Sequence, residues 1–291
     1  MENNNKIIYP TLEEYLGNLD ELSKIDFKDC SYDGIYNKFF DLALTIQSLG
    51  AYLVAEKING RKIYRARLAK HINVNEDLSL IKTYSYPPSN FCSNNGRANV
   101  KFKSVFYCSD NFYSAIKEIN ATEQDELYLS VWEFQTKRDL KYVSYLPVDL
   151  PNNNYWRDIV GFHIDYLKNN NQENIGLSCK LALRNFITDR FIMEESPYPL
   201  TSMIANENMY YENADLLIYP SVKVFQDYVN YALHPNVADK HIVIKKVFHL
   251  KGIKFFKENT KIEVLRVGEI DDDRIIWRAT VDFDKKDLGL F

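Results

Sequence analysis

The chain has 291 residues, and its 36 lysines and arginines against 40 aspartates and glutamates give a net charge of −4 and a pI near 5.8. A mildly acidic chain lacks the basic face through which proteins bind nucleic acid by charge, which excludes direct nucleic-acid binding of that kind. With 46% hydrophobic and 26% charged residues, the composition is that of an ordinary globular protein with a full core.

The N-terminal part is expected to be helical. Residues 36–57 carry apolar side chains at helical spacing, broken only by Gly50. From residue 61 the pattern changes, and residues 61–68 alternate as a strand does. A stretch rich in Asn and Ser then runs to Gly96, and it predicts a long ordered loop.

A strand that turns directly into a helix is predicted next. Residues 104–108, SVFYC, form a short β-type run, and residues 111–119 place apolar side chains along one helical stripe. Either Ser109 or Asp110 can cap this helix, because short polar side chains accept hydrogen bonds from the first free backbone N–H groups.

The second half of the chain mixes strands and helices. The predicted segments are strands over 126–134, 140–146, 214–222 and 241–250, helices over 156–168 and 175–193 with a polar connector at 169–171, and a hairpin with an acidic turn at 271–273.

This order lacks the strict β-α-β alternation of a doubly wound parallel sheet and favours an α+β fold. We expect one main domain over 61–255, with an N-terminal helical extension over 1–60 and a C-terminal β-hairpin extension over 256–291.

Several classes of site are excluded by residue spacing. The two closest glycines, Gly50 and Gly60, are ten positions apart, so neither a Rossmann fingerprint nor a Walker loop is present. The histidines form no H-E-x-x-H motif, and the four widely spaced cysteines predict reduced thiols rather than disulfides or a zinc knuckle. A polar start and the lack of any apolar run of about 18 residues predict a cytoplasmic protein that does not bind membranes.

Three segments together resemble the RES domain, a family named for an Arg, a Glu and a Ser. They are YRARL at 64–68, GRANV through SAIKEI at 96–119, and YPSV at 219–222, and the resemblance covers about 61–255. It implies an ADP-ribosyltransferase-like core of mixed or antiparallel β-sheets with flanking helices. Proteins of this family are typically toxins of bacterial toxin–antitoxin pairs that destroy NAD.

The resemblance implies that two arginines bind a dinucleotide. Arg65 matches the family arginine, and Arg97 of the G-R-A-N turn would be a second cation in the same pocket; both are implied to contact the NAD pyrophosphate. The chemistry agrees, because guanidinium groups hold phosphates in a bidentate manner where no glycine-rich loop is present. Arg67 is interpreted as an exposed strand residue.

Four further residues complete the implied site. The resemblance places Glu118 beside the scissile bond, where a fixed anion stabilises the oxocarbenium-like ribose. Tyr107 would pack against the nicotinamide or its ribose, and Ser221, at the end of a buried strand, would bind and orient rather than attack. Asn230 matches a further polar position of the family.

The predicted function is that of an enzyme that takes NAD as substrate and cleaves its nicotinamide–ribose bond, without a metal. Its acceptor, water or phosphate, is left open, so the enzyme is either an NAD glycohydrolase or an NAD phosphorylase. Two alternatives remain: an ADP-ribosyltransferase that modifies a protein, and a noncatalytic nucleotide-binding module. The family implies a helix-turn-helix antitoxin as partner, and the two extensions leave a homodimer open.

Overall fold

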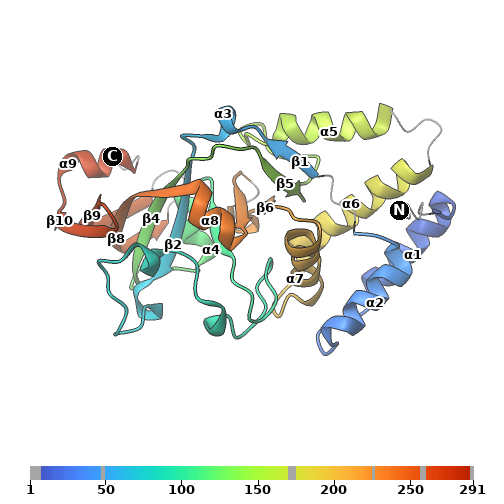
Figure 1. The fold of residues 1–291 in the computed structure, drawn as a ribbon, viewed down its shortest axis with the longest axis horizontal. Helices are drawn as coiled ribbons and strands as arrows, with labels where there is room; N and C mark the ends of the chain where they lie inside the picture. The colour runs from blue at the N-terminus through green and yellow to red at the C-terminus, as the bar shows by residue number, and fades with distance from the viewer. Residues whose placement is uncertain (1–7, 47–49, 170–174, 225–226, 256–259, 289–291) are drawn as a thin grey trace. The chain divides into compact units, whose positions relative to one another are not determined.

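The computed structural model describes residues 8–46, 50–169, 175–224, 227–255 and 260–288. The chain divides into two compact units, each assembled from three separate segments. The first unit contains residues 1–51, 92–103 and 142–220, and the second contains 52–91, 104–141 and 221–291. Figure 1 shows the helices and strands of both units. No helix in the described ranges is long and apolar enough to cross a membrane.

The first unit is mainly helical. Its helices are α1 (Leu12–Lys24), α2 (Tyr32–Ala43), α5 (Arg157–Asn169), α6 (Ile175–Met193) and α7 (Pro199–Asn206), which continues into a π-helical turn over Glu207–Tyr211. A capping box starts α1: Thr11 Oγ1 accepts from the Glu14 N–H at 3.3 Å, and the Glu14 carboxylate accepts from the Thr11 N–H at 2.9 Å.

The predicted N-terminal helical character is confirmed by α1 and α2, but the pattern of residues 36–57 does not form one helix, and its residues 47–49 lie outside the described residues. Leu44 adopts a left-handed conformation with φ 64° and ends α2 there, although the apolar spacing continues. The chain then forms β1 (Gly50–Leu53) and the short helix α3 (Ala55–Ile58). A left-handed residue therefore overrides the helical pattern of residues 36–57.

A parallel strand pair also belongs to the first unit. Strand β5 (Leu140–Ser144) begins in the second unit, and its residues from Tyr142 pair in parallel with β6 (Leu216–Pro220). All five residues of β6 are buried, which explains its continuous apolar sequence. Both predicted strands and both predicted long helices are confirmed. Residues 170 and 171 of the expected connector lie outside the described residues.

The second unit contains an antiparallel sheet with the strand order β7-β3-β2-β4-β8-β9-β10. Its strands are β2 (Lys62–Leu68), β3 (Phe106–Ser109), β4 (Glu126–Phe134), β7 (Val229–Leu233), β8 (Ile242–Phe255), β9 (Thr260–Asp271) and β10 (Arg274–Ala279). Its helices besides α3 are α4 (Phe112–Glu118), α8 (Pro235–His241) and α9 (Asp282–Asp287). Together with the parallel β5–β6 pair, these ladders confirm an α+β fold with mixed β-structure.

One face of this sheet, here called the α4 face, carries an apolar core. Ala115 and Ile116 of α4 pack there with alternating residues of the central strands. The buried members of this core are Ala66, Leu68, Ala115, Ile116, Leu127, Leu129, Val131, Phe248, Leu250, Val264, Val267 and Leu288. This apolar core therefore holds α4 against the sheet.

An ordered loop follows β2, as predicted, and it contacts the opposite face of the sheet through Thr83 and Tyr84. Three short 3₁₀ turns at 69–71, 81–84 and 89–91 lie in this loop. Arg67 anchors it, because its guanidinium binds both carboxylate oxygens of Glu76 at 2.6 and 2.7 Å and the Thr83 carbonyl at 2.8 Å. The interpretation of Arg67 as an exposed strand residue is therefore wrong, and its role is structural.

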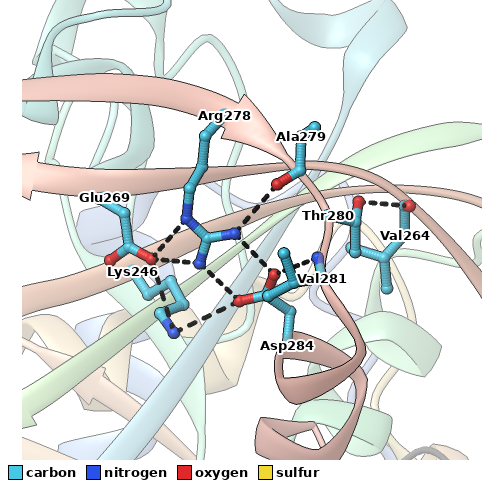
Figure 2. Close-up of polar contacts among 8 residues, drawn as sticks. All are labelled: Lys246, Val264, Glu269, Arg278, Ala279, Thr280, Val281 and Asp284. Carbon is cyan, nitrogen blue, oxygen red and sulfur yellow. Dashed lines mark hydrogen bonds and ion pairs between the residues drawn. The ribbon is translucent and has the colours of Figure 1, made fainter.

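An ion-pair network around the buried carboxylate of Asp284 stabilises the C-terminal end (Figure 2). Arg278 of β10 donates to both oxygens of Asp284 at 2.7 Å and to Glu269 of β9 at 2.5 Å. The Asp284 side chain is fully buried, and Lys246 lies 3.8 Å from it. The predicted acidic hairpin is confirmed as β9–β10, and this network holds α9, which the sequence pattern did not indicate, against the hairpin.

Candidate active site

Glu118 is the last residue of α4, which follows β3 after a tight turn. Asn111 is the N-cap, and its Oδ1 accepts from the Tyr113 N–H at 2.8 Å. The prediction that Ser109 or Asp110 caps this helix is therefore wrong. The packing of α4 on the sheet keeps the Glu118 backbone in one place, so that its partners decide where the carboxylate lies.

The Glu118 carboxylate is held by two buried donors from distant parts of the chain. The Ser221 hydroxyl donates to Oε1 at 2.6 Å, and the Asn230 side-chain amide donates to the same oxygen at 2.8 Å. Ser221 is 0% and Asn230 5% exposed, whereas Glu118 is half-buried. From the described residues, no hydrogen bond or ion pair reaches the second oxygen, Oε2. The carboxylate is thus oriented through one oxygen and presents the other.

Backbone contacts position both donors. Asn230 is the second residue of β7 and pairs with Ser109 at the end of β3. The Ser221 N–H donates to the Tyr228 carbonyl at 3.1 Å, just before β7 begins. Ser221 and Asn230 therefore both depend on the same short segment, residues 228–230, for their position beside Glu118.

Arg65 bridges two strands at the point where their ladder stops. The single β2–β3 pair is Tyr64↔Ser109, and beyond it Arg65 Nη1 donates to the Tyr107 carbonyl at 2.9 Å. The guanidinium also lies over the Phe106 ring, 5.5 Å from its centroid. The Arg65 guanidinium therefore lies beside β3, next to the one backbone pair that joins β2 and β3.

Strand alternation decides which face each side chain takes. Tyr64 packs on the α4 face, so Arg65 leaves β2 on the opposite face. Tyr107 leaves β3 on the α4 face, as do Ser109 and its neighbour Asn230 on β7. The fold therefore brings Tyr107, Asn230 and Glu118 to one face of the sheet and Arg65 to the other, where it donates to the Tyr107 carbonyl.

Arg97 belongs to the first unit. Its Nη1 donates to the Phe191 carbonyl, and its guanidinium lies 4.8 Å from the centroid of the Tyr198 ring. Of the six residues singled out in the sequence, the second unit holds Arg65, Tyr107, Glu118, Ser221 and Asn230, and three of them, Glu118, Ser221 and Asn230, form one hydrogen-bonded group.

Sequence reasoning assigned Asp110 only to helix capping, and its place in the site was missed. Its Oδ1 accepts from the Val229 N–H at 3.0 Å, directly beside Asn230, and burial raises its pKa to about 7. The available signal was an acidic residue at a strand end between a buried strand and a helix. Burial also raises the pKa of the Cys108 thiol, which keeps that thiol protonated. Within the described ranges, no three His, Cys, Asp or Glu side chains gather as metal ligands would.

Comparison with known proteins adds a family match. A family model described as the RES domain matches residues 62–251. Among solved structures, the crystal structure of the M. tuberculosis MbcT–MbcA toxin–antitoxin complex is similar with a TM-score of 0.39 and 10% sequence identity, covering 82% of this chain and 93% of that chain. No curated protein matches the sequence.

Proposed function

The chain belongs to the RES domain family, and on this premise we propose that it is a toxin enzyme that binds NAD and cleaves the nicotinamide–ribose bond. The observation that carries the proposal is the Glu118 carboxylate, which Ser221 and Asn230 hold through Oε1. A carboxylate prepared in this way suits a reaction in which positive charge develops on a sugar.

The chemistry explains why a fixed anion is needed. When the bond from ribose C1 to the pyridinium nitrogen breaks, the electron pair stays with nicotinamide, and the positive charge moves onto the ribose. Glu118 Oε2 faces this charge or binds a ribose hydroxyl, so the carboxylate stabilises the transition state more than the substrate. A water or phosphate oxygen then forms the new bond to C1, and an attacking water releases one proton to the solvent.

Ser221 and Asn230 act as orienting residues in this proposal. The Ser221 hydroxyl donates its hydrogen to Glu118 at 2.6 Å, which supports a role in binding and orientation rather than in nucleophilic attack. Asn230 donates at 2.8 Å to the same oxygen and restricts the carboxylate to one rotamer. Both donors are buried, so solvent does not compete with them.

Arg65, Arg97 and Tyr107 are assigned to substrate binding. Arg65 is proposed to supply a guanidinium beside β3 that binds two oxygens of the pyrophosphate. Arg97, which lies in the first unit, is proposed as a further substrate-binding cation, as the family resemblance implies. Tyr107 leaves β3 on the α4 face, which Glu118 also occupies, and is proposed to pack against nicotinamide or its ribose.

The physiological setting is part of the proposal. We infer that the protein acts in the cytoplasm, where NAD depletion arrests growth, and that a helix-turn-helix antitoxin occludes the site. Substrate and partner both follow from the family, and the oriented carboxylate of Glu118 supports the reaction on the substrate.

The test is NAD turnover by the purified protein. Nicotinamide release is followed with and without phosphate, and phosphorus NMR separates ADP-ribose from its phosphate ester. Label from radioactive NAD that becomes attached to protein would instead identify an ADP-ribosyltransferase. The matched variants are Glu118→Gln and Glu56→Gln, since Glu56 is an exposed glutamate of the same unit. If the wild type binds NAD but releases no nicotinamide, the result would favour the noncatalytic nucleotide-binding module.

A further inference from the structure

Asp110 completes the β3–β7 ladder with its side chain. The ladder of backbone pairs ends at Ser109↔Asn230, and the next pair would join Asp110 and Val229. The Asp110 N–H still donates to the Val229 carbonyl at 3.2 Å, but the Val229 N–H donates to Asp110 Oδ1 at 3.0 Å. A carboxylate oxygen therefore takes the place of the backbone carbonyl, and this lets the chain turn into α4 one residue later.

The same segment of β7 supports both donors to Glu118. Val229 is fully buried, and its carbonyl also accepts from the Ser109 hydroxyl at 2.7 Å. Asn230 follows it directly, while the preceding carbonyl, that of Tyr228, holds the Ser221 N–H at 3.1 Å. A shift of this segment would therefore move Ser221 and Asn230 together.

We propose that Asp110 is a positioning residue, which fixes the start of β7 so that Ser221 and Asn230 orient the Glu118 carboxylate. The inference rests on the proposed function, since it adds to that site a residue that acts through Asn230 and touches no substrate. A buried N–H without an acceptor is costly, so without Asp110 Oδ1 the β7 backbone moves toward another acceptor. That movement lengthens the hydrogen bond from the Asn230 amide to Glu118, which is now 2.8 Å.

The surroundings of Asp110 agree with a carboxyl that holds a backbone rather than an ion pair. The ionisable groups coupled to it are Arg61, whose positive charge favours its ionised form, and Cys108 and Tyr228, whose pKa values its negative charge raises. None of these groups supplies the Val229 N–H with another acceptor. The acceptor oxygen is therefore the feature of Asp110 that its role requires.

Two substitutions separate the acceptor from the charge. Asp110→Asn keeps an Oδ1 acceptor of the same shape, whereas Asp110→Ala removes it. We expect Asp110→Ala to lower kcat for nicotinamide release by about tenfold or more, with KM changed less than twofold, because misplaced catalytic groups slow the chemical step. Asp110→Asn should retain kcat within about twofold of the wild type, and Asp273→Ala, in the exposed β9–β10 turn, is the neutral control. Circular dichroism checks that each variant is folded at the assay temperature.

A double-mutant cycle with Asn230→Ala distinguishes positioning from general destabilisation. Since Asp110 acts in part through Asn230, the loss caused by Asp110→Ala should be clearly smaller in the Asn230→Ala background than in the wild type. Fully additive losses, or a kcat for Asp110→Asn as low as that for Asp110→Ala, would overturn the proposal.

A readout without turnover keeps the test independent of the proposed function. The side-chain amide signals of Asn230 in ¹⁵N-labelled protein, identified by their loss in Asn230→Ala, should shift in Asp110→Ala and stay in place in Asp110→Asn. If the wild type releases no nicotinamide, the proposed function fails, and these signals alone judge the positioning role. Unchanged Asn230 signals in Asp110→Ala would refute that role.

Discussion

Replacing Glu118 by Gln tests the site most directly, because the change removes one charge and little else. The glutamine keeps an Oε1 that accepts from Ser221 and Asn230, whose bonds of 2.6 and 2.8 Å orient the present carboxylate. With that orientation kept, the amide nitrogen replaces the oxygen that faces the ribose. The variant therefore retains size, rotamer and buried partners, and what is lost is the negative charge at the reacting centre.

The expected loss follows from Coulomb's law. A carboxylate and a positive ribosyl centre about 4 Å apart attract by about 4 kcal/mol at an effective dielectric constant of about 20. Loss of that energy in the transition state slows the reaction by about 1,000-fold. The charge develops only during bond breaking, so kcat should fall while KM for NAD changes little.

Steady-state nicotinamide release, with single-turnover measurements to isolate the chemical step, checks this expectation. Glu56→Gln should leave both constants unchanged, because its carboxylate is exposed on α3. A fall in kcat of less than about threefold for Glu118→Gln, or a change confined to KM, would show that the carboxylate does not face the developing charge.

Three further predictions concern Arg65, Asp110 and Asp284. Arg65→Lys should raise KM for NAD by about tenfold, measured in the same assay, because an ammonium cannot bind a phosphate in bidentate fashion while holding the Tyr107 carbonyl. For Asp110, the folded-state pKa of about 7 lies above the ordinary value of 3.8, so ionisation opposes folding, and stability should fall by about 4 kcal/mol as the pH rises from about 4 to 7; urea unfolding of Asp110→Asn should lack this fall. For Asp284, bonded to Arg278, the pKa lowered to about 2 predicts stability that is present above about pH 4 and lost as the pH falls through 2, so Asp284→Asn should cost about 2 kcal/mol of unfolding free energy at pH 7.

Some strands could be predicted from the sequence almost residue by residue. The segment 126–134 is β4 with the same bounds, because its apolar and β-branched residues suit a strand buried on both faces. The hairpin of β9 and β10 was likewise recognisable, since an acidic turn separates two apolar runs. The local sequence pattern was sufficient wherever the residues of the strand themselves favoured the strand conformation.

The local sequence pattern failed where the side chains that it assigned to a helix cap form tertiary contacts instead. Ser109 and Asp110 are good N-cap residues, but the Ser109 hydroxyl donates to the Val229 carbonyl and the Asp110 carboxylate accepts from the Val229 N–H. Both side chains are therefore engaged across the sheet, and Asn111 caps α4 instead. Nothing within the segment shows that β7, more than a hundred residues later, will claim them.

The partners of Glu118 were beyond sequence reasoning for the same reason. The family resemblance singled out Glu118, Ser221 and Asn230 separately, and it assigned the latter two to the substrate. Ser221 and Asn230 lie 103 and 112 positions from Glu118 along the chain, and both bond to its carboxylate. Their meeting depends on the pairing of β3 with β7, which no single-sequence pattern specifies.

The register of that pairing is itself a functional requirement. Successive residues of a strand point to opposite faces, so a slip of one residue between β3 and β7 would turn the Asn230 amide away from Glu118. The pairing has only four backbone pairs, Phe106↔Leu233 to Ser109↔Asn230. A fifth, half made by the Asp110 side chain, extends the ladder at the end that carries Asn230. Asp110, which lets the chain turn into α4, therefore also opposes this register slip. Such a slip would remove the Asn230 hydrogen bond from the Glu118 carboxylate at the other end of α4.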